Sequence, residues 1–344
     1  MKKRVHLLTA VLIAVMALVL CGSPVPAQAA AGNKELTIGI IYLTSEHPYY
    51  QAHAAHTRNY AAQLGLNLRE IDGRLDQANM ATQMENLIAQ KVDGIIYCLL
   101  EPTPSSVDIN AAQEAGIPVV TFAIKHHPAA ASCPFVGLDE FEAGKRGGVK
   151  AGELFKEKFP GEQAHVVVIE MPGQAASENR SDGFFAGFRS VVADANLVAR
   201  LHGGGVKDKS MSVTEDILQS NPKLNVFFGA NGDQGLGALA ALEAQGRGTI
   251  ETELVISHDG SEPEVLKIVD PKSALKIANA NRPKELAYQC IDTLLEIING
   301  TRDMKDTSDI VVDTAVITGE DVNACQEFIR DEYVSTIRLP GATN

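Results

Sequence analysis

The stretch LTIGIIYLTSEHPYYQAHAAHTRNYAAQLGLNLREID, residues 36–72, decides the fold of this chain. It begins with an apolar, isoleucine-rich run at 36–43, which has the length and composition of a buried parallel strand. A polar turn leads into a helical pattern that Gly65 ends, as a C-terminal glycine commonly does. Residues 66–71 begin a second strand. The stretch therefore predicts a βαβ unit whose first turn lies at the carboxyl end of a strand, where open α/β sheets bind ligands.

The turn after the first strand differs from a nucleotide-binding loop. It lacks the G-x-G-x-x-G pattern and places Tyr49 and Tyr50 directly after Pro48. Aromatic rings suit stacking on the apolar face of a ligand, whereas phosphate binding needs glycines and free backbone amides. Neighbouring positions on a helix cannot both face one core, so at least one of the two tyrosines is expected in a cleft.

The same alternation continues through the rest of the chain. Strand and helix patterns follow one another, and they start afresh near residue 164. Alternation at this spacing predicts parallel sheets covered by helices on both faces. Each run has the size of a domain, so the sequence predicts an α/β fold with two similar lobes. The last residues, 339–344, are expected to form a frayed tail.

Composition narrows the classes of function. The chain has 344 residues, of which 45% are hydrophobic and 21% charged, and its formal net charge is -13. These fractions are typical of a folded protein, and the length favours two domains. The acidic balance argues against a nucleic-acid partner, because such binding depends on lysine and arginine neutralising phosphates.

The first 29 residues have the pattern of a secretory signal peptide. A basic segment precedes an apolar core at 7–20, and Ala27-Gln28-Ala29 forms a cleavage site of small residues. Two alternatives stay open. The core could be a membrane anchor, although spanning a bilayer takes about 20 apolar residues. Cys21 could instead be lipidated, although Leu20 is large for the residue before a lipoprotein cysteine.

Four further cysteines leave their redox state open. Cys98, Cys133, Cys290 and Cys325 could form disulfides in an oxidising compartment, but their spacing fits no metal site. Cys98 lies in a predicted strand and is expected to be a small buried hydrophobe. We expect neither a metal nor a cofactor.

Several motifs occur together in one order. They are IGIIYLTSEHPYY, VDGIIYCLLEPT, AAQEAGIPVVTF, FVGLDEFEAGKRGG, ENRSDGFFAGF, VFFGANGDQGLGAL, ISHDG and ANANRP. On these motifs the chain, from about 36 to 312, resembles the periplasmic sugar-binding proteins of the ribose and galactose type. The resemblance implies two doubly wound parallel-sheet lobes that are joined by a three-crossing hinge, with the ligand in the cleft between them. Such lobes close by hinge motion.

The resemblance also implies lobe boundaries. The N-terminal lobe would comprise 35–138 plus 282–313, the C-terminal lobe 139–281 plus 314–334, and a tail 335–344. The three crossings would lie near Leu138, Asn281 and Asp313.

Ligand-binding residues carry over from the family one position at a time. The expected set is His47, Tyr49, Tyr50, Glu101, Arg180, Asn231, Asp259 and Asn281. Tyr49 and Tyr50 match the aromatic pair that stacks on the sugar. Glu101 stands where the family has an asparagine that contacts the sugar. Asn231 and Asp233 flank a glycine before a helix; we assign helix capping to Asp233 and ligand contact to Asn231.

Two departures from the family pattern bear on the ligand. Sugar binders of this family often carry Asp-Arg after the VVTF-like strand, but this chain has Ala123-Ile124-Lys125. A third aromatic expected near 205–206 is absent, and the protein contains no tryptophan. The cleft therefore keeps polar groups but loses its usual clamp on ring hydroxyls, which makes a standard aldopyranose less secure as the ligand.

An enzyme is the rival class. His47, Glu101, Arg180 and Asp259 could form an acid–base set, but the chain has no G-x-S-x-G, H-E-x-x-H or paired cysteine–histidine motif. We expect no catalytic residues. The sequence predicts a monomeric periplasmic binding protein that captures a sugar or polyol and delivers it to an ABC permease in the inner membrane. The alternative is a ligand-binding input for a chemoreceptor or membrane histidine kinase, whose ligand could be a compound other than a sugar.

Overall fold

The computed structural model describes residues 35–343. The expected signal peptide, with Cys21 and the cleavage site, lies outside the described residues. From Thr37 onward, strands and helices alternate along the chain. The α/β fold class predicted from the sequence is confirmed.

The first sheet has six strands in the order β11-β5-β4-β3-β1-β2. Their bounds are β1 Thr37–Tyr42, β2 Asn67–Asp72, β3 Gly94–Cys98, β4 Val119–Phe122, β5 Phe135–Gly137 and β11 Asp309–Val311. All of these strands pair in parallel. The neighbours of β1 are β2 and β3, so the strand order reverses at β1. This reversal is the switch point at which doubly wound sheets open a crevice.

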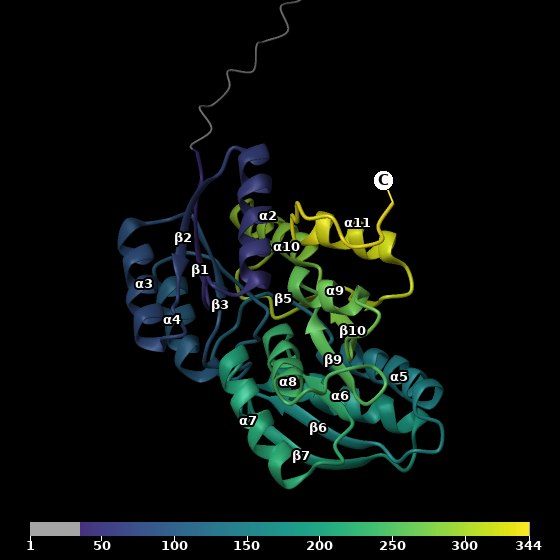
Figure 1. Cartoon of the computed structure of the whole chain (residues 1–344). Helices are drawn as coiled ribbons and strands as arrows, with labels where there is room; N and C mark the ends of the chain where they lie inside the picture. The colour runs from purple at the N-terminus through teal and green to yellow at the C-terminus, as the bar shows by residue number, and fades with distance from the viewer. Residues whose placement is uncertain (1–34, 344) are drawn as a thin grey trace, which may run out of the picture. The chain divides into compact units, whose positions relative to one another are not determined.

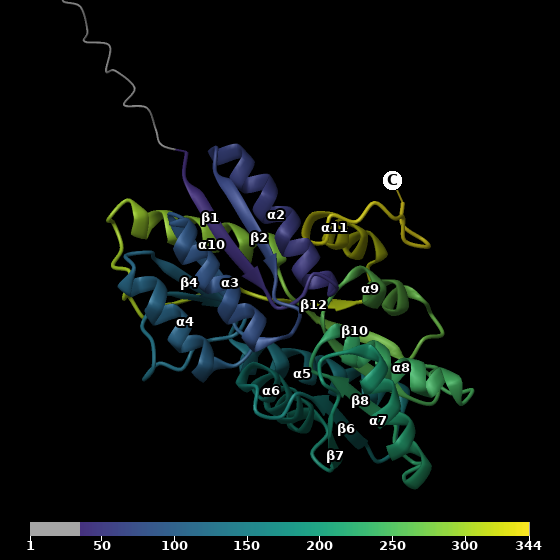
Figure 2. The same ribbon diagram turned by 90° about the vertical axis from the view of Figure 1, so that its left-hand side faces the viewer.

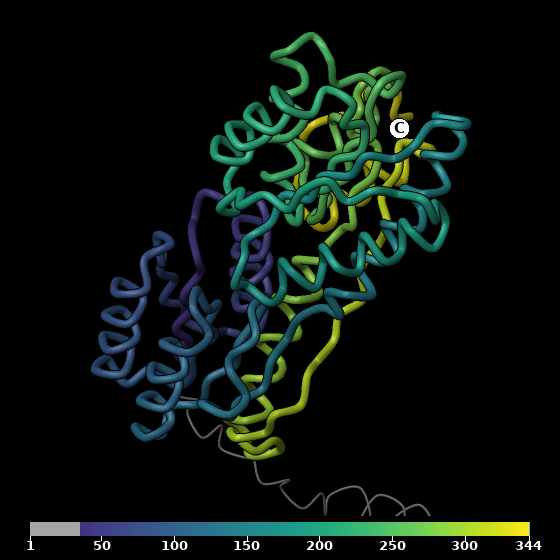
Figure 3. The backbone as a smooth tube through the Cα atoms, turned by 90° about the horizontal axis from the view of Figure 1, so that it is seen from below, coloured from purple at the N-terminus to yellow at the C-terminus, as the bar shows by residue number. Residues whose placement is uncertain are grey.

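Helices cover both faces of this sheet (Figure 1). Helix α2, Pro48–Leu64, packs with α10, Pro283–Ile298, while α3, Gln77–Gln90, packs with α4, Pro102–Glu114. Strands enclosed on both sides should be apolar throughout, and every residue of β3 and β4 is buried. Figure 3 shows the yellow-green segment around α10 lying beside the purple and blue part of the chain, although the two are far apart in sequence.

The second sheet repeats the arrangement in the order β12-β10-β9-β8-β6-β7. Its strands are β6 His165–Glu170, β7 Asn196–His202, β8 Val226–Gly229, β9 Leu254–Asp259, β10 Leu275–Ala280 and β12 Ala315–Thr318. Five of them run parallel, but β12 pairs antiparallel with β10. The second lobe therefore departs from a purely parallel sheet at one edge.

The side chains of β6 divide the hydrophobic core of this sheet into two layers. Val166 and Val168 pack with residues of α5, Glu140–Lys158, and α6, Ala175–Val191. Val167 and Ile169 point the other way, because successive strand residues alternate between faces. They pack with residues of α7, Lys207–Ser220, α8, Gly232–Ala244, and α9, Glu262–Val269.

The chain passes between the two sheets at three places. It leaves β5 of the first sheet for α5 of the second, returns from β10 to α10, and crosses again from β11 to β12. The crossings near Leu138, Asn281 and Asp313 that we expected fall in these connections. The residue boundaries assigned to each lobe remain our proposal.

The C-terminal residues differ from the expected frayed tail. Helix α11, Val322–Glu332, lies beside α9 (Figure 2), and the chain then folds back so that Leu339 is only 1% exposed. Leu339 packs in a cluster with Val265, Cys325 and Ile329, and its backbone N–H donates to Gln326 Oε1 at 2.6 Å. The expectation was wrong because these few apolar residues cover an apolar surface of α9 and α11.

The described part of the chain contains no helix with the length and hydropathy needed to span a bilayer. Cys98, Cys133, Cys290 and Cys325 are all buried free thiols.

Candidate functional site

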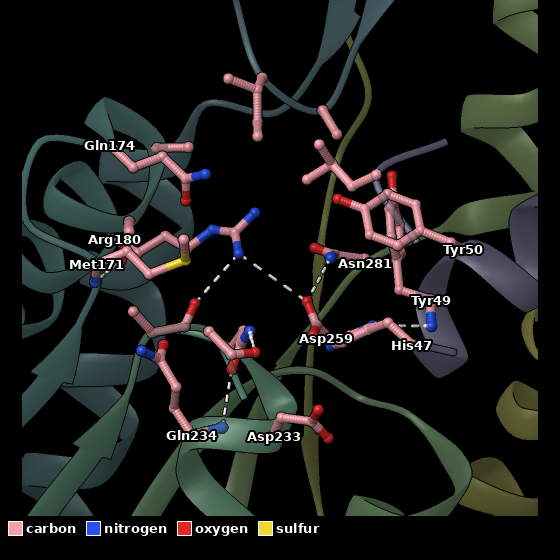
Figure 4. A pocket seen from close by; sticks show the side chains of 18 of the residues that line it. His47, Tyr49, Tyr50, Met171, Gln174, Arg180, Asp233, Gln234, Asp259 and Asn281 are labelled. Atoms are coloured by element: carbon pink, nitrogen blue, oxygen red, sulfur yellow. Dashed lines mark hydrogen bonds and ion pairs between the residues drawn. The ribbon is translucent and has the colours of Figure 1, made fainter. Parts of the chain in front are cut away.

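A cavity of about 330 Å³ opens at the carboxyl ends of strands from both sheets (Figure 4). Its volume is at the lower end of the range for small-molecule sites. Seven of the eight predicted site residues line it, namely His47, Tyr49, Tyr50, Arg180, Asn231, Asp259 and Asn281. The fold brings them together because each follows or ends a strand, or lies in the first turns of the next helix.

The structure does not bring Glu101 to this cavity. Its backbone N–H donates to Gln77 Oε1 at 3.2 Å, and its side chain is exposed. Glu101 is the N-cap residue of α4, which begins at Pro102. The exposed Glu101 side chain is not among those that line the cavity.

Asp259 is the most extensively contacted residue of the cavity. It is 3% exposed. Its Oδ2 accepts the backbone N–H of Gly232 at 3.0 Å, and its Oδ1 accepts Asn281 Nδ2 at 2.8 Å. Burial raises the pKa of the Asp259 carboxyl, and the neighbouring Arg180 guanidinium opposes that shift. These donors fix the carboxylate in place at the end of β9.

The backbone of Asp259 has an unusual conformation that neighbouring residues hold in place. Its φ of 111° lies in a region that residues other than glycine rarely adopt. The Tyr333 hydroxyl donates to the Asp259 carbonyl oxygen at 2.6 Å, and Asn281 N–H donates to the same oxygen at 2.9 Å. Strain of this kind persists only where surrounding contacts impose it, and it is common at functional sites.

Arg180 reaches the cavity from α6. Its Nη1 donates to the Ala230 carbonyl oxygen at 3.1 Å and lies 3.9 Å from Asp259 Oδ1. Its Nε and Nη2 donate to the two carboxylate oxygens of Glu140 at 2.6 and 2.9 Å. Burial raises the pKa of the Glu140 carboxyl, and the positive charge of Arg180 opposes this rise. The guanidinium is thus held from one side and directed toward the centre of the cavity (Figure 4).

The helix-capping role that we expected of Asp233 belongs to Asn231, and the expected ligand contact of Asn231 remains a prediction. Asn231 is the N-cap of α8, and its Oδ1 accepts the backbone N–H of Gln234 at 2.8 Å. Its Nδ2 donates to the Gly205 carbonyl oxygen at 3.0 Å. Asp233, the predicted cap, lines the cavity, and its carboxylate forms no hydrogen bond or ion pair within residues 35–343. Both residue types cap helices well, so the sequence did not distinguish them.

The aromatic residues enter from the start of α2. Tyr49 belongs to the hydrophobic core of the first sheet and Tyr50 packs against it, yet both rings border the cavity. The ring centroids are 5.0 Å apart at 71°. Burial raises the pKa of both phenols, so they remain protonated and able to donate.

His47 links the two walls of the cavity. It is the N-cap of α2, where its Nδ1 accepts the backbone N–H of Tyr49 at 3.2 Å. Its Nε2 lies 3.6 Å from Asp259 Oδ2 and has no hydrogen-bond partner among the described residues. A ring nitrogen that is buried without a partner leaves one hydrogen-bonding position free.

A family model described as a periplasmic binding protein domain matches residues 38–302. The chain belongs to the periplasmic binding protein family. It is 32% identical to the ABC transporter periplasmic-binding protein YphF of Escherichia coli over 76% of this chain and 82% of that protein. It is 27% identical to the ribose import binding protein of Bacillus subtilis over 81% of this chain and 87% of that protein.

A solved structure supports the fold. A periplasmic solute-binding protein of Actinobacillus succinogenes, crystallised with bound D-allose, superposes with a TM-score of 0.75. The match covers 86% of this chain and all (100%) of that one, at 23% sequence identity. At this identity the likeness concerns the fold, which agrees with the two sheets described above.

Several lining residues of this periplasmic binding protein escaped the sequence analysis. They are Glu140, Met171, Gln174, Ser177, Asp233 and Gln234. Glu140 follows Asp139 at a helix start, where acidic residues are expected for their interaction with the helix dipole, so nothing marked it as a partner of Arg180. Residues 35–343 contain no cluster of three or more His, Cys, Asp or Glu side chains able to hold a metal ion.

Some of the positions that depart from the family pattern line the cavity, and one does not. Ala123 and Ile124 line it, as do Gly205 and Val206. Lys125 points elsewhere, since its Nζ pairs with Asp309 Oδ2 at 2.6 Å in an exposed position.

Proposed function

We propose that this periplasmic binding protein captures a small polyhydroxylated ligand, a sugar or polyol, and delivers it to an ABC permease in the inner membrane. The observation that carries the proposal is the convergence of Arg180, Asn231, Asp259 and Asn281 on one cavity beside two tyrosines. The names of the relatives support it, because one is a ribose import binding protein and another an ABC transporter periplasmic-binding protein.

The chemistry of the cavity suits hydroxyl groups. A hydroxyl both donates and accepts, so it binds best where donors and acceptors alternate. Here the Arg180 guanidinium, carboxylates and amides line the cavity, and the rings of Tyr49 and Tyr50 beside them offer apolar faces. We propose His47, Tyr49, Tyr50, Arg180, Asn231, Asp259 and Asn281 as the ligand-binding set.

Binding without catalysis is part of the proposal. Asp259, a candidate general base, already accepts hydrogen bonds from Gly232 and Asn281. Glu140 is engaged by Arg180 on both oxygens. Carboxylates occupied in this way position other groups more readily than they transfer protons.

The cellular location follows from the expected signal peptide. We propose a monomer released into the periplasm after cleavage behind Ala29. Mass spectrometry of the protein recovered from its native periplasm should find Ala30 as the first residue. A lipid-modified Cys21 at the amino terminus would overturn this part of the proposal.

Hinge closure is the proposed functional event. Ligand in the cavity would contact side chains of both sheets, so saturating ligand should favour a closed state. Small-angle scattering should record a smaller radius of gyration with a tight ligand than without it. An unchanged radius would contradict closure while leaving binding intact.

A thermal-shift screen of sugars, polyols and nucleosides tests the function. A ligand at 100 times its dissociation constant stabilises the folded state by about 2.7 kcal/mol, which is readily detected. Failure of every sugar and polyol to shift the melting temperature would overturn the proposal.

Calorimetry on variants then tests the site. Losing a hydrogen bond to a charged group costs about 1.5–3 kcal/mol, so Arg180→Ala and Asp259→Ala should each weaken binding roughly ten- to more than a hundredfold. Lys125→Ala is the control, because that side chain pairs with Asp309 at the surface. Parent-like affinity in both cavity variants would show that the ligand binds elsewhere.

A further inference from the structure

The two walls of the cavity differ in chemistry. The second sheet and its helices supply most of the polar groups. The first sheet and its loops supply Thr44, Glu46, His47 and the two tyrosines, together with five aliphatic residues. These are Leu43, Leu75, Ala123, Ile124 and Leu138. We call these five residues the aliphatic wall.

Leu75 combines an unfavourable backbone conformation with an exposed apolar side chain. It is 44% exposed, and its φ of 52° lies in the left-handed region, which is costly for a branched side chain. Its backbone N–H donates to the Leu43 carbonyl oxygen at 2.8 Å, which fixes it beside the cavity. An apolar group of a ligand that covered Leu75 would remove this surface from water and gain free energy.

Ala123 is a second apolar residue in an unfavourable backbone conformation. Its φ of 61° is also left-handed, a conformation that glycine, asparagine and aspartate adopt more easily than alanine. Its backbone N–H donates to the Val136 carbonyl oxygen at 3.2 Å, so the turn is held by the sheet. The backbone would favour a polar side chain here, yet the chain presents a methyl group, with Ile124 beside it.

This wall sets a condition on the ligand. A hydroxyl pressed against the side chain of Leu75, of Ala123 or of Ile124 would lose hydrogen bonds to water without gaining a partner from that side chain. A methyl or methylene group at the same place would lose nothing and would bury apolar surface. On the opposite wall, Arg180 and Asp259 can form hydrogen bonds with hydroxyl groups.

We propose that the ligand is a deoxy or C-methyl polyhydroxy compound that turns its oxygen-free edge to the aliphatic wall and its hydroxyls to Arg180, Asn231 and Asp259. This inference rests on the proposed function, since it specifies which polyhydroxylated compounds the cavity selects. Leu75, Ala123 and Ile124 are its specificity-determining residues.

Matched pairs of sugars provide the test. Titration calorimetry compares L-fucose with L-galactose, L-rhamnose with L-mannose, D-fucose with D-galactose, and 2-deoxy-D-ribose with D-ribose. In at least one pair, the deoxy sugar should bind at least about tenfold more tightly than its hydroxylated counterpart. This factor corresponds to the cost of burying one hydroxyl without a hydrogen-bond partner.

The outcomes separate the two proposals. If sugars bind but the deoxy member is never favoured, or if the tightest ligand of the wider screen carries oxygen on every carbon, the inference is overturned and the proposed function stands. If no sugar or polyol binds at all, the proposed function fails and the inference fails with it.

Variants locate the selectivity on the wall. Leu75→Asn and Ala123→Asn suit a left-handed backbone, so both should fold, and both should reduce the preference for the deoxy member about fivefold or more. Leu64→Asn is the matched control, because Leu64 is a leucine of similar exposure, 42%, that does not line the cavity. Unchanged preference in both wall variants, with melting temperatures that show folded protein, would overturn the assignment.

Discussion

The Nε and Nη2 groups of Arg180 donate to the two carboxylate oxygens of Glu140, at 2.6 and 2.9 Å, and both side chains are nearly buried. A two-point contact of this kind fixes both the position and the plane of the guanidinium. Nη1 donates to the Ala230 carbonyl oxygen and lies in the cavity beside Asp259. Glu140 therefore acts as a positioning residue for the arginine that we propose to bind the ligand.

Replacing Glu140 tests this relationship. Glu140→Gln keeps the shape of the side chain but removes its charge and one acceptor. Loss of a hydrogen bond to a charged group costs about 1.5–3 kcal/mol, so the variant should be less stable by that order. Because Arg180 is no longer fixed, ligand affinity should fall about tenfold, which corresponds to 1.4 kcal/mol. Denaturant titration and calorimetry measure the two effects.

Glu142→Gln is the control on the same helix. Glu142 pairs with Lys145 on the exposed face, where ion pairs contribute little. Equal affinity of Glu140→Gln and the parent protein would mean that Arg180 keeps its orientation without the carboxylate.

Asn231 and Asp233 should respond in opposite ways to truncation. Asn231→Ala removes the N-cap of α8 and should lower the free energy of unfolding by about 1 kcal/mol. Asp233→Ala removes no hydrogen bond or ion pair of the described residues, so stability should be nearly unchanged and any loss should appear in ligand affinity. Urea unfolding and calorimetry on the pair separate the roles. A large stability loss in Asp233→Ala would show that the capping role lies there after all.

Local pattern was sufficient to predict the fold. The buried isoleucines of β1 and the glycine after α2 act through short-range chemistry, so they could be recognised along the chain. The antiparallel strand β12 could not be recognised from the sequence. Its four residues are only partly buried, and their pairing depends on β10, which is far away in sequence.

The site was harder to predict wherever the role of a residue depends on its partner. Glu101 was expected in the cavity because of its place in a motif, but its exposed side chain does not line the cavity. Glu140 was missed because its partner, Arg180, lies 40 residues further on. The resemblance identified which strand ends matter; the distances between side chains decided which residues meet.

Glycines along the contact between α5 and α6 allow these helices to approach closely. A Cβ added at Gly148 would lie 2.1 Å from the Phe184 carbonyl oxygen, and one at Gly144 would lie 2.1 Å from that of Arg180. Backbone atoms cannot move aside as a flexible side chain can. This contact also carries Glu140 and Arg180, so its spacing affects the site.

Gly148→Ala should therefore destabilise the protein. Alanine favours an exposed helix by about 1 kcal/mol over glycine, but forcing atoms into a packed contact costs roughly 1–3 kcal/mol or more. We expect a net loss in the free energy of unfolding, measured with urea. Glu153→Ala, on the exposed face of α5, should show no such loss. A more stable Gly148→Ala variant would mean that the two helices can separate without cost.

Glu264, in the first turn of α9, carries a buried carboxyl group. It is fully buried, and its Oε2 accepts the Ser261 backbone N–H and hydroxyl, each at 2.7 Å. Burial, with a further contribution from the charge of Asp259, raises the pKa of the Glu264 carboxyl to about 8. The folded state therefore retains a proton that the unfolded chain, with a pKa near its usual 4.5, has already released.

This difference fixes the sign of a pH effect. Between about pH 4.5 and 8 the native state binds more protons than the unfolded state, so the contribution of Glu264 to stability falls as the pH rises through this window. Glu264→Gln can keep the bond to Ser261 N–H but cannot ionise. Urea unfolding at pH 5, 7 and 9 should show the stability of the parent protein falling relative to that of the variant at each step. Glu327→Gln, at an exposed position of α11, should follow the parent. Parallel pH profiles for Glu264→Gln and the parent would mean that Glu264 ionises in the folded protein as easily as in the unfolded chain.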